Sequence, residues 1–170
     1  MYKIPLNIGT LAGMVSFGLF LGMYYLGLSP LSVGKFIGFW VPIAAIIWAN
    51  LQVREKVLAG TMTYFQAFLT GSLTVLVWCT FKGFCMYIFM TAFNQHVIDQ
   101  YFEFTESYIR YAEQLTGDNI GDQIDLDELK KGVNPWNLMM ADISNNTIFG
   151  SFISFIVAFI TKRAPKGPSL

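Results

Sequence analysis

The chain has 170 residues, of which 54% are hydrophobic and only 13% are charged. Soluble domains usually carry about a quarter charged residues, so this composition argues against an ordinary water-soluble enzyme. The formal net charge of zero hides a separation of charge along the chain. Residues 99–142 hold ten acidic and three basic side chains, a net charge of −7, and the rest holds one acidic and eight basic, a net charge of +7.

Four stretches of the chain are long and apolar enough to cross a bilayer. The hydrocarbon core is about 30 Å thick, so a spanning helix needs roughly 20 mostly apolar residues. We expect transmembrane helices over about residues 5–28, 36–52, 64–93 and 135–161. A cleaved signal peptide is the alternative for the first stretch, but its apolar run exceeds the usual length of about 7–15 residues. Splitting the third stretch at Lys82 would add a fifth span, but both pieces would be short.

Two of these spans have explicit start signals. Thr63 and Gln66 have the spacing of a capping box, in which each side chain bonds the other residue's backbone amide. Asn134 is followed by Pro135, which combines a favourable N-cap with the residue best suited to the first helical position. These signals predict helix starts at Tyr64 and Pro135.

Basic residues near the spans predict the orientation, because they are retained on the cytoplasmic side. With four spans, that side receives Lys3, Arg54, Lys56, Lys162, Arg163 and Lys166. The opposite side receives Lys35 and the acidic segment 94–134. We therefore predict a single membrane domain over residues 1–170. Its fold is all-α, an integral membrane four-helix bundle with both termini cytoplasmic and an extracytoplasmic helical segment between spans three and four.

The outer segment begins with an amphipathic pattern. Its apolar residues recur at helical spacing: Val97, Tyr101, Phe104, Tyr108, Tyr111 and Leu115. The simplest interpretation is that this face packs onto the protruding ends of helices three and four; the alternatives are a docking surface for a partner and a face resting in the outer lipid headgroups. The acidic loop that follows does not match a calcium-binding loop, because Ile120 stands at the third position from Asp118. We expect a solvated acidic loop, and a nonstandard cation site is the alternative.

Residues that could carry chemistry are few. The chain has one histidine, His96, and two cysteines, Cys79 and Cys85, which are six residues apart and therefore on different faces of one helix. No zinc-ligand set, catalytic triad or phosphate-binding loop is indicated. We expect no enzymatic activity, no cofactor, no metal ion and no nucleic-acid partner.

Lys82 is the exception, because an ionisable group inside a membrane helix is a functional hypothesis by default. Lys82 lies 18 residues, or about 27 Å, from Tyr64, and Asp142 lies 19 residues, or about 28 Å, from Thr161. The two helices are antiparallel, so the charges lie at one level. We predict an ion pair between them, or a contact of Lys82 with Asn145 or Asn146. The alternative is that Lys82 extends to the outer headgroups without a partner.

Small residues recur at intervals of four, which lets helices approach closely along one face. These are Gly9, Gly13, Gly18, Gly22, Gly34, Gly38, Gly150, Ser154 and Ala158. The spacing predicts tight helix packing, either within the chain or with another subunit.

Two segments resemble a known family. They are residues 60–71, which enter the third span, and residues 145–154, which continue in the last span to Lys162 and Arg163. They look like the four-helix membrane proteins of domain-of-unknown-function family 4199, which is common in Bacteroidota. The resemblance implies a location in the bacterial inner membrane and no catalytic residues. Members of the family are often encoded near a polyprenyl-phosphate sugar transferase, which implies an accessory role in envelope glycan assembly.

Three functions follow as hypotheses. The first is a non-enzymatic accessory or scaffold subunit of a cell-envelope complex that presents the acidic, aromatic segment outside the cytoplasmic membrane. The second is a small transporter or ion conduit that uses Lys82 and Asp142, with Asn145 and Asn146. The third is an accessory to polyprenyl-linked sugar transfer. The expected partners are membrane lipid and another membrane or periplasmic protein, or a second copy of the chain.

Overall fold

The computed structural model describes residues 2–27, 38, 40–93, 96–116 and 133–163. The described residues form helices and no strand, apart from one isolated bridge between Met62 and Arg163. The elements are α1 (Lys3–Tyr25), α3 (Trp40–Lys56), α4 (Tyr64–Ile88), the short π-helix η1 (Phe89–Phe93), α5 (His96–Thr116) and α7 (Pro135–Thr161).

The helix starts predicted from capping residues are confirmed. The Gln66 backbone N–H donates to Thr63 Oγ1 at 3.3 Å, and the Thr63 N–H donates to Gln66 Oε1 at 3.0 Å. Asn134 Oδ1 accepts from the Asn137 N–H at 2.8 Å, and Pro135 opens α7. Satisfying these otherwise unpaired N–H groups defines where each helix begins.

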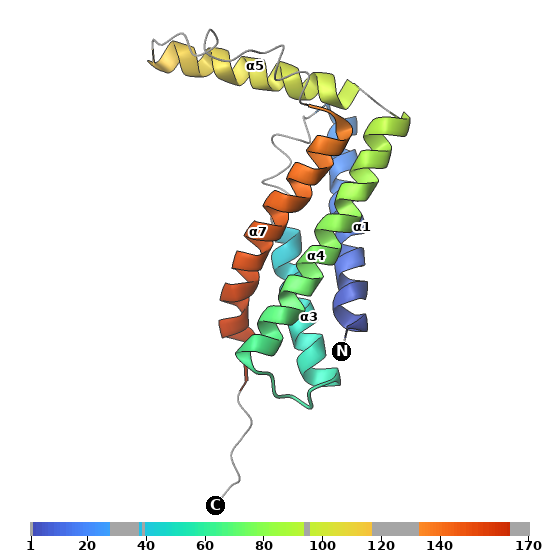
Figure 1. Cartoon of the computed structure of the whole chain (residues 1–170), viewed down its shortest axis with the longest axis vertical. Helices are drawn as coiled ribbons and strands as arrows, with labels where there is room; N and C mark the ends of the chain where they lie inside the picture. The colour runs from blue at the N-terminus through green and yellow to red at the C-terminus, as the bar shows by residue number, and fades with distance from the viewer. Residues whose placement is uncertain (1, 28–37, 39, 94–95, 117–132, 164–170) are drawn as a thin grey trace, which may run out of the picture.

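α4 is the central element of the packing (Figure 1). It packs against α1, α3 and α7, and it runs parallel to α1 and antiparallel to α7. The largest buried cluster takes side chains from all four of these helices: Ile8, Ala12, Ala45, Ile46, Ala49, Val75, Trp78, Cys79, Ile153 and Val157. Small residues are frequent in this cluster, which lets the helices pack closely.

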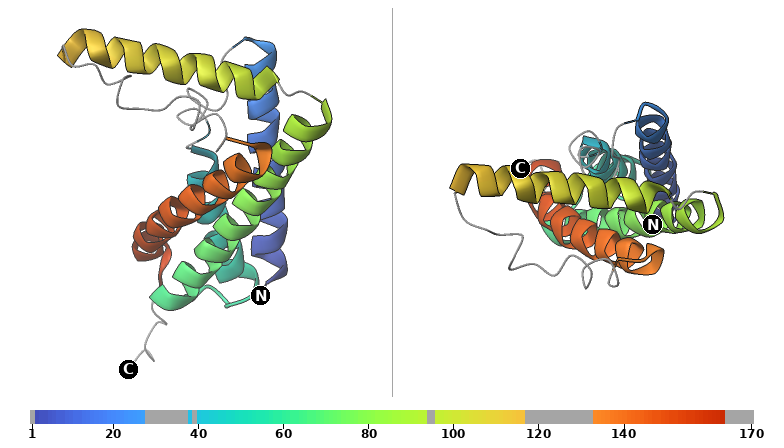
Figure 2. Two further views of the ribbon diagram at one scale, coloured as in Figure 1. Left: turned by 45° about the horizontal axis from the view of Figure 1, so that its top comes forward. Right: turned by 90° about the horizontal axis from the view of Figure 1, so that it is seen from above.

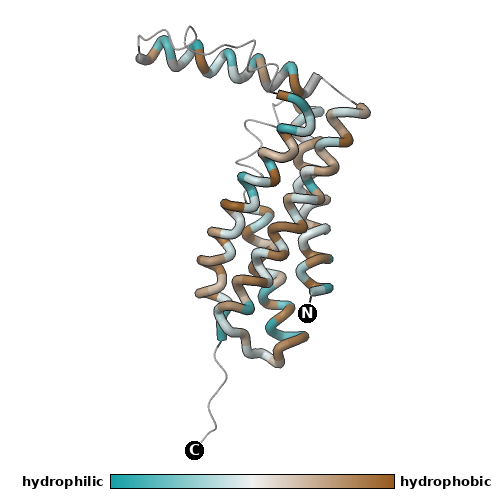
Figure 3. The backbone as a smooth tube through the Cα atoms, in the orientation of Figure 1, coloured by the Kyte–Doolittle hydropathy of each residue, from teal (hydrophilic) through white to brown (hydrophobic). Residues whose placement is uncertain are grey.

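Three helices are long and apolar enough to cross a membrane, over Lys3–Tyr25, Tyr64–Phe93 and Pro135–Thr161. Large apolar side chains are exposed on their outer surfaces, among them Met14, Leu69, Phe84, Phe152 and Ile160, and hydrophobic positions extend along most of their length (Figure 3). α3 continues past the predicted end of the second span at residue 52 to Lys56, with Arg54 and Lys56 in its last turn. The predicted start near residue 36 lies outside the described residues. The predicted connection 29–35 and the acidic loop 117–132 lie outside the described residues.

α5 lies across one end of the packed helices and projects beyond them (Figures 1 and 2). Its beginning is docked, because it contacts η1 and Ile98 packs against the cluster of Phe20, Met86 and Met90. Tyr108, Tyr111 and Leu115 are 66%, 59% and 70% exposed. The expectation that these three side chains pack onto the ends of α4 and α7 is therefore wrong, because the helix extends away from those ends.

Candidate functional site between α4 and α7

Lys82 and Asp142 form an ion pair between α4 and α7. Lys82 Nζ lies 2.9 Å from Asp142 Oδ2 and 3.1 Å from Oδ1, and the two side chains are 15% and 14% exposed. Gly83 allows the helices to meet here, since a Cβ atom at this position would lie 2.8 Å from Ile143 Cγ1. Residue counting predicted that these two charges lie at the same height on antiparallel helices, and the structure confirms that they are in contact.

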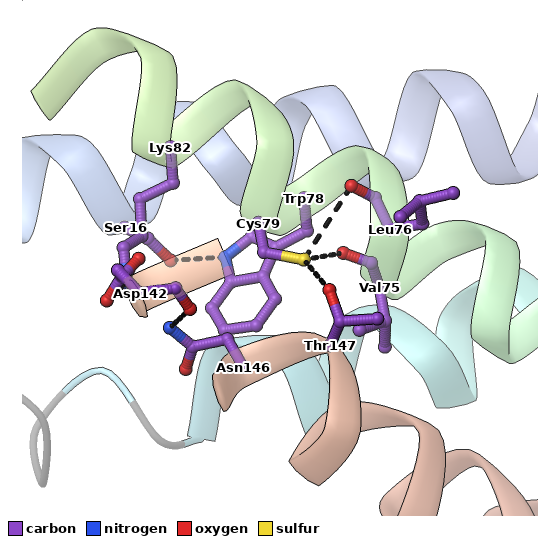
Figure 4. Close-up of polar contacts among 9 residues, drawn as sticks. All are labelled: Ser16, Val75, Leu76, Trp78, Cys79, Lys82, Asp142, Asn146 and Thr147. Atoms are coloured by element: carbon purple, nitrogen blue, oxygen red, sulfur yellow. Dashed lines mark hydrogen bonds and ion pairs between the residues drawn. The ribbon is translucent and has the colours of Figure 1, made fainter. Parts of the chain in front are cut away.

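The other contacts predicted for Lys82 are not what the structure shows. Asn146 Nδ2 donates to the Asp142 backbone carbonyl at 2.7 Å, so its amide bonds its own helix (Figure 4). Asn145 is exposed. The interpretation that Lys82 reaches the headgroups without a partner is wrong, because Asp142 pairs with it.

A tryptophan connects this pair to α1. Lys82 Nζ lies 5.4 Å from the centroid of the Trp78 ring, within the range of a cation–π interaction. Trp78 Nε1 donates to Ser16 Oγ at 2.8 Å, and both residues are buried (Figure 4). The pair therefore belongs to a polar layer that joins α1, α4 and α7.

A second polar contact joins α4 and α7 next to this layer. Cys79 Sγ lies 3.2 Å from Thr147 Oγ1, with either atom as donor, and 2.8 Å from the Val75 carbonyl. Cys79 and Cys85 are both free thiols. Within the described ranges, no three His, Cys, Asp or Glu side chains gather as a metal site.

The polar layer is suited to holding α4 and α7 in a fixed position relative to each other. Moving a charge out of water is costly, and an opposite charge at hydrogen-bonding distance offsets much of that cost. Because α4 and α7 each supply one charge, sliding or rotating either helix would leave a largely buried charge without its partner. The pair therefore favours one register of α7 against α4.

Sequence reasoning missed a second polar cluster, at the opposite end of α7. Asn50 Nδ2 donates to Thr161 Oγ1 at 3.0 Å, and Arg54 Nη1 donates to the Thr161 carbonyl at 3.3 Å. Asn50 and Thr161 are buried. Asn50 was detectable as the polar residue in the otherwise apolar run 36–51, but its partner on α7 was not.

The predicted small-residue positions separate into two groups. Gly9, Gly13 and Gly150 are in close contact with α4: a Cβ atom on Gly9 would lie 2.7 Å from the Thr74 carbonyl oxygen, one on Gly13 would lie 2.9 Å from Phe81 Cδ1, and one on Gly150 would meet Val75. Ser154 and Ala158 are fully buried.

The remaining small residues do not have this role. A Cβ atom added to Gly18, Gly22 or Gly38 would meet no atom of the described residues within 4 Å. Gly34 lies outside the described residues. Among the described residues, only part of the small-residue pattern is therefore used for packing between helices.

The amphipathic face of α5 is partly described. The side chains of Val97, Tyr101 and Phe104 are not among those that the structure describes, and those of Tyr108, Tyr111 and Leu115 are exposed. Away from this face, Arg110 Nη2 lies 2.5 Å from Glu106 Oε1 in an exposed i,i+4 ion pair.

Three described helices are long and apolar enough to cross a membrane, and they expose apolar side chains on their outer surfaces. The protein is therefore of the α-helical class, with helices typical of membrane proteins. The chain matches the model of a family of proteins of unknown function, DUF4199, over residues 7–163. It belongs to that family, and the resemblance seen in residues 60–71 and 145–154 is confirmed. No curated protein and no solved structure matches the chain significantly.

Proposed function

We propose that the protein crosses the bacterial cytoplasmic membrane four times, through α1, α3, α4 with η1, and α7, and that both termini are cytoplasmic. α3 is included because Ile46 and Ala49 are fully buried among the three longer helices. Described cations gather at the end where α1 begins and α3 and α7 end: Lys3, Arg54, Lys56, Lys162 and Arg163. The acidic helix α5 lies at the other end. Retention of basic residues in the cytoplasm supports this orientation.

Within this topology the protein acts as a non-enzymatic accessory or scaffold subunit of an envelope complex. The observation that carries this role is the exposure of Tyr108, Tyr111 and Leu115 on a helix that projects beyond the packed helices. Aromatic side chains exposed together are typical of protein interfaces. The proposed partner is a membrane or periplasmic protein that covers this face.

The ion pair supports a positioning role more than a transport role. Lys82 and Asp142 neutralise each other, and Trp78 lies against the lysine. A conduit would use groups that exchange partners during transport, whereas these contacts hold α4 and α7 in register. A role beside polyprenyl-linked sugar transfer is compatible with a scaffold subunit and stays a prediction from the family.

Site-specific photo-crosslinking tests the partner face. A photoreactive phenylalanine analogue at Tyr111 is expected to give a discrete protein adduct in native membranes, because this side chain is exposed on α5. The control position is Ile160, which is 76% exposed on α7 and should contact lipid. A protein adduct at Ile160 but none at Tyr111 would contradict the proposed role.

A further inference from the structure

Three cationic residues lie near the C-terminal end of α7. The Arg54 guanidinium bonds the Thr161 carbonyl, and Lys162 and Arg163 follow directly in the chain. The backbone of Arg163 is fixed, because its N–H donates to the Met62 carbonyl at 2.8 Å and its carbonyl accepts from the Met62 N–H at 2.9 Å. The cluster therefore has a defined place in the fold, between the ends of α3 and α7 and the start of α4.

The positive charge of this cluster exceeds what the described residues around it neutralise. The C-terminal end of α7 carries the equivalent of about half a negative charge. Glu55 is the one acidic residue of the chain outside positions 99–142, and its Oε1 lies 3.8 Å from Arg54 Nη2. Lys162 and Arg163 are both exposed. Two full positive charges are thus available for an external anion.

An exposed aromatic surface adjoins the cations. Lys162 Nζ lies 5.1 Å from the centroid of the Phe159 ring. Phe159 and Phe155 are 53% and 48% exposed, and their ring centroids are 5.5 Å apart. Tyr64 packs against both rings, and its hydroxyl donates to the Phe155 carbonyl at 3.3 Å. A charged group and an apolar surface are therefore continuous along one side of α7.

We propose that this surface is a binding site for an anionic phospholipid of the cytoplasmic leaflet. Lys162 contacts the phosphate group, Arg163 and Arg54 add to the local positive potential, and the acyl chains lie along Phe159 and Phe155. Charge alone would equally suit a nucleic acid or an acidic peptide. The continuity of the cations with an exposed apolar surface favours a ligand that has a phosphate and hydrocarbon chains in one molecule. The proposal rests on the membrane insertion proposed above.

Titration with defined lipids tests the site. The full-length protein in detergent is titrated with phosphatidylglycerol and with phosphatidylcholine, and bound lipid is counted by native mass spectrometry. We expect phosphatidylglycerol to bind more tightly. The double variant Lys162→Gln/Arg163→Gln should lose about 25-fold in this affinity, because each cation near an anionic headgroup contributes about fivefold. Inorganic phosphate should not compete at equal concentration, since it lacks the acyl chains.

The matched control removes the same charge from the same end of the molecule. Lys3→Gln/Lys56→Gln loses two exposed cations on α1 and α3 and should keep the preference for phosphatidylglycerol. Equal binding of both lipids by the unaltered protein would overturn the proposal, as would equal losses in the two double variants. Competition by inorganic phosphate would show a simple anion site instead. Membrane insertion is measured separately by carbonate extraction, so its failure and that of the lipid site are distinguishable.

Discussion

At the residue scale, the Lys82–Asp142 pair makes a quantitative prediction. Lys82→Met and Asp142→Asn should each destabilise the protein by about 1–3 kcal/mol, because each leaves one charge unpaired in an apolar environment. The double variant should lose less than the sum of the two, with a coupling energy of at least about 1 kcal/mol. Unfolding in mixed micelles with increasing denaturing detergent measures these losses.

The exposed pair Glu106–Arg110 on α5 is the control for this experiment. Its side chains are 46% and 72% exposed, so solvent screening should reduce the coupling of Glu106→Gln and Arg110→Gln to about 0.5 kcal/mol or less. Strictly additive losses for Lys82→Met and Asp142→Asn would show that the pair contributes no net stabilisation.

The sequence predicted that Lys82 and Asp142 lie at the same height along α4 and α7. It did not predict which residues surround the pair. The capping box defines where α4 begins, and Asp142 was counted back from Thr161 at the end of α7. Because a helix rises by a constant amount per residue, this counting placed Lys82 opposite Asp142. The hydrogen bond from Trp78 to Ser16 depends on how α1 is rotated about its own axis against α4. Rotation is decided by side-chain packing between helices, which spacing along one helix does not report.

At the element scale, the glycines of α1 distinguish packed from open positions. Gly9→Ala should destabilise the protein by about 1–3 kcal/mol, because the new Cβ would lie 2.7 Å from the Thr74 carbonyl oxygen and 2.8 Å from Val77 Cβ, and α1 would have to move away from α4. Gly18→Ala is the matched control, since no described atom lies within 4 Å of a Cβ there, and its stability should change by no more than about 0.5 kcal/mol.

The same unfolding assay compares the two variants. Equal destabilisation by Gly9→Ala and Gly18→Ala would mean that an unseen contact covers Gly18, as in a dimer formed through α1. A neutral Gly9→Ala would contradict the close approach of α1 and α4. The repeated glycine spacing predicted that helices pack closely, but it did not distinguish the glycines that contact α4 from those that do not. Which face meets α4 becomes visible only when the helices are placed together.

α5 shows a related limit of the sequence pattern. The helical spacing of its apolar residues correctly predicted an amphipathic helix after the third span, because this spacing follows from helix geometry alone. Periodicity describes the faces of a helix and carries no information about the direction in which the helix leaves its predecessor. The predicted packing of Tyr108 and Tyr111 onto the span ends was wrong for this reason.

At the scale of the whole molecule, the separation of charge predicts topology. Cations at one end and the acidic α5 at the other are expected to orient the chain with α5 outside the cytoplasmic membrane. In spheroplasts, Tyr111→Cys should react with a membrane-impermeant maleimide, whereas Lys56→Cys should react only after lysis. The unaltered protein measures the background, because Cys79 is buried and Cys85 half-buried. Labelling of Lys56→Cys in intact spheroplasts, with Tyr111→Cys protected, would reverse the topology and move the proposed lipid site to the outer leaflet.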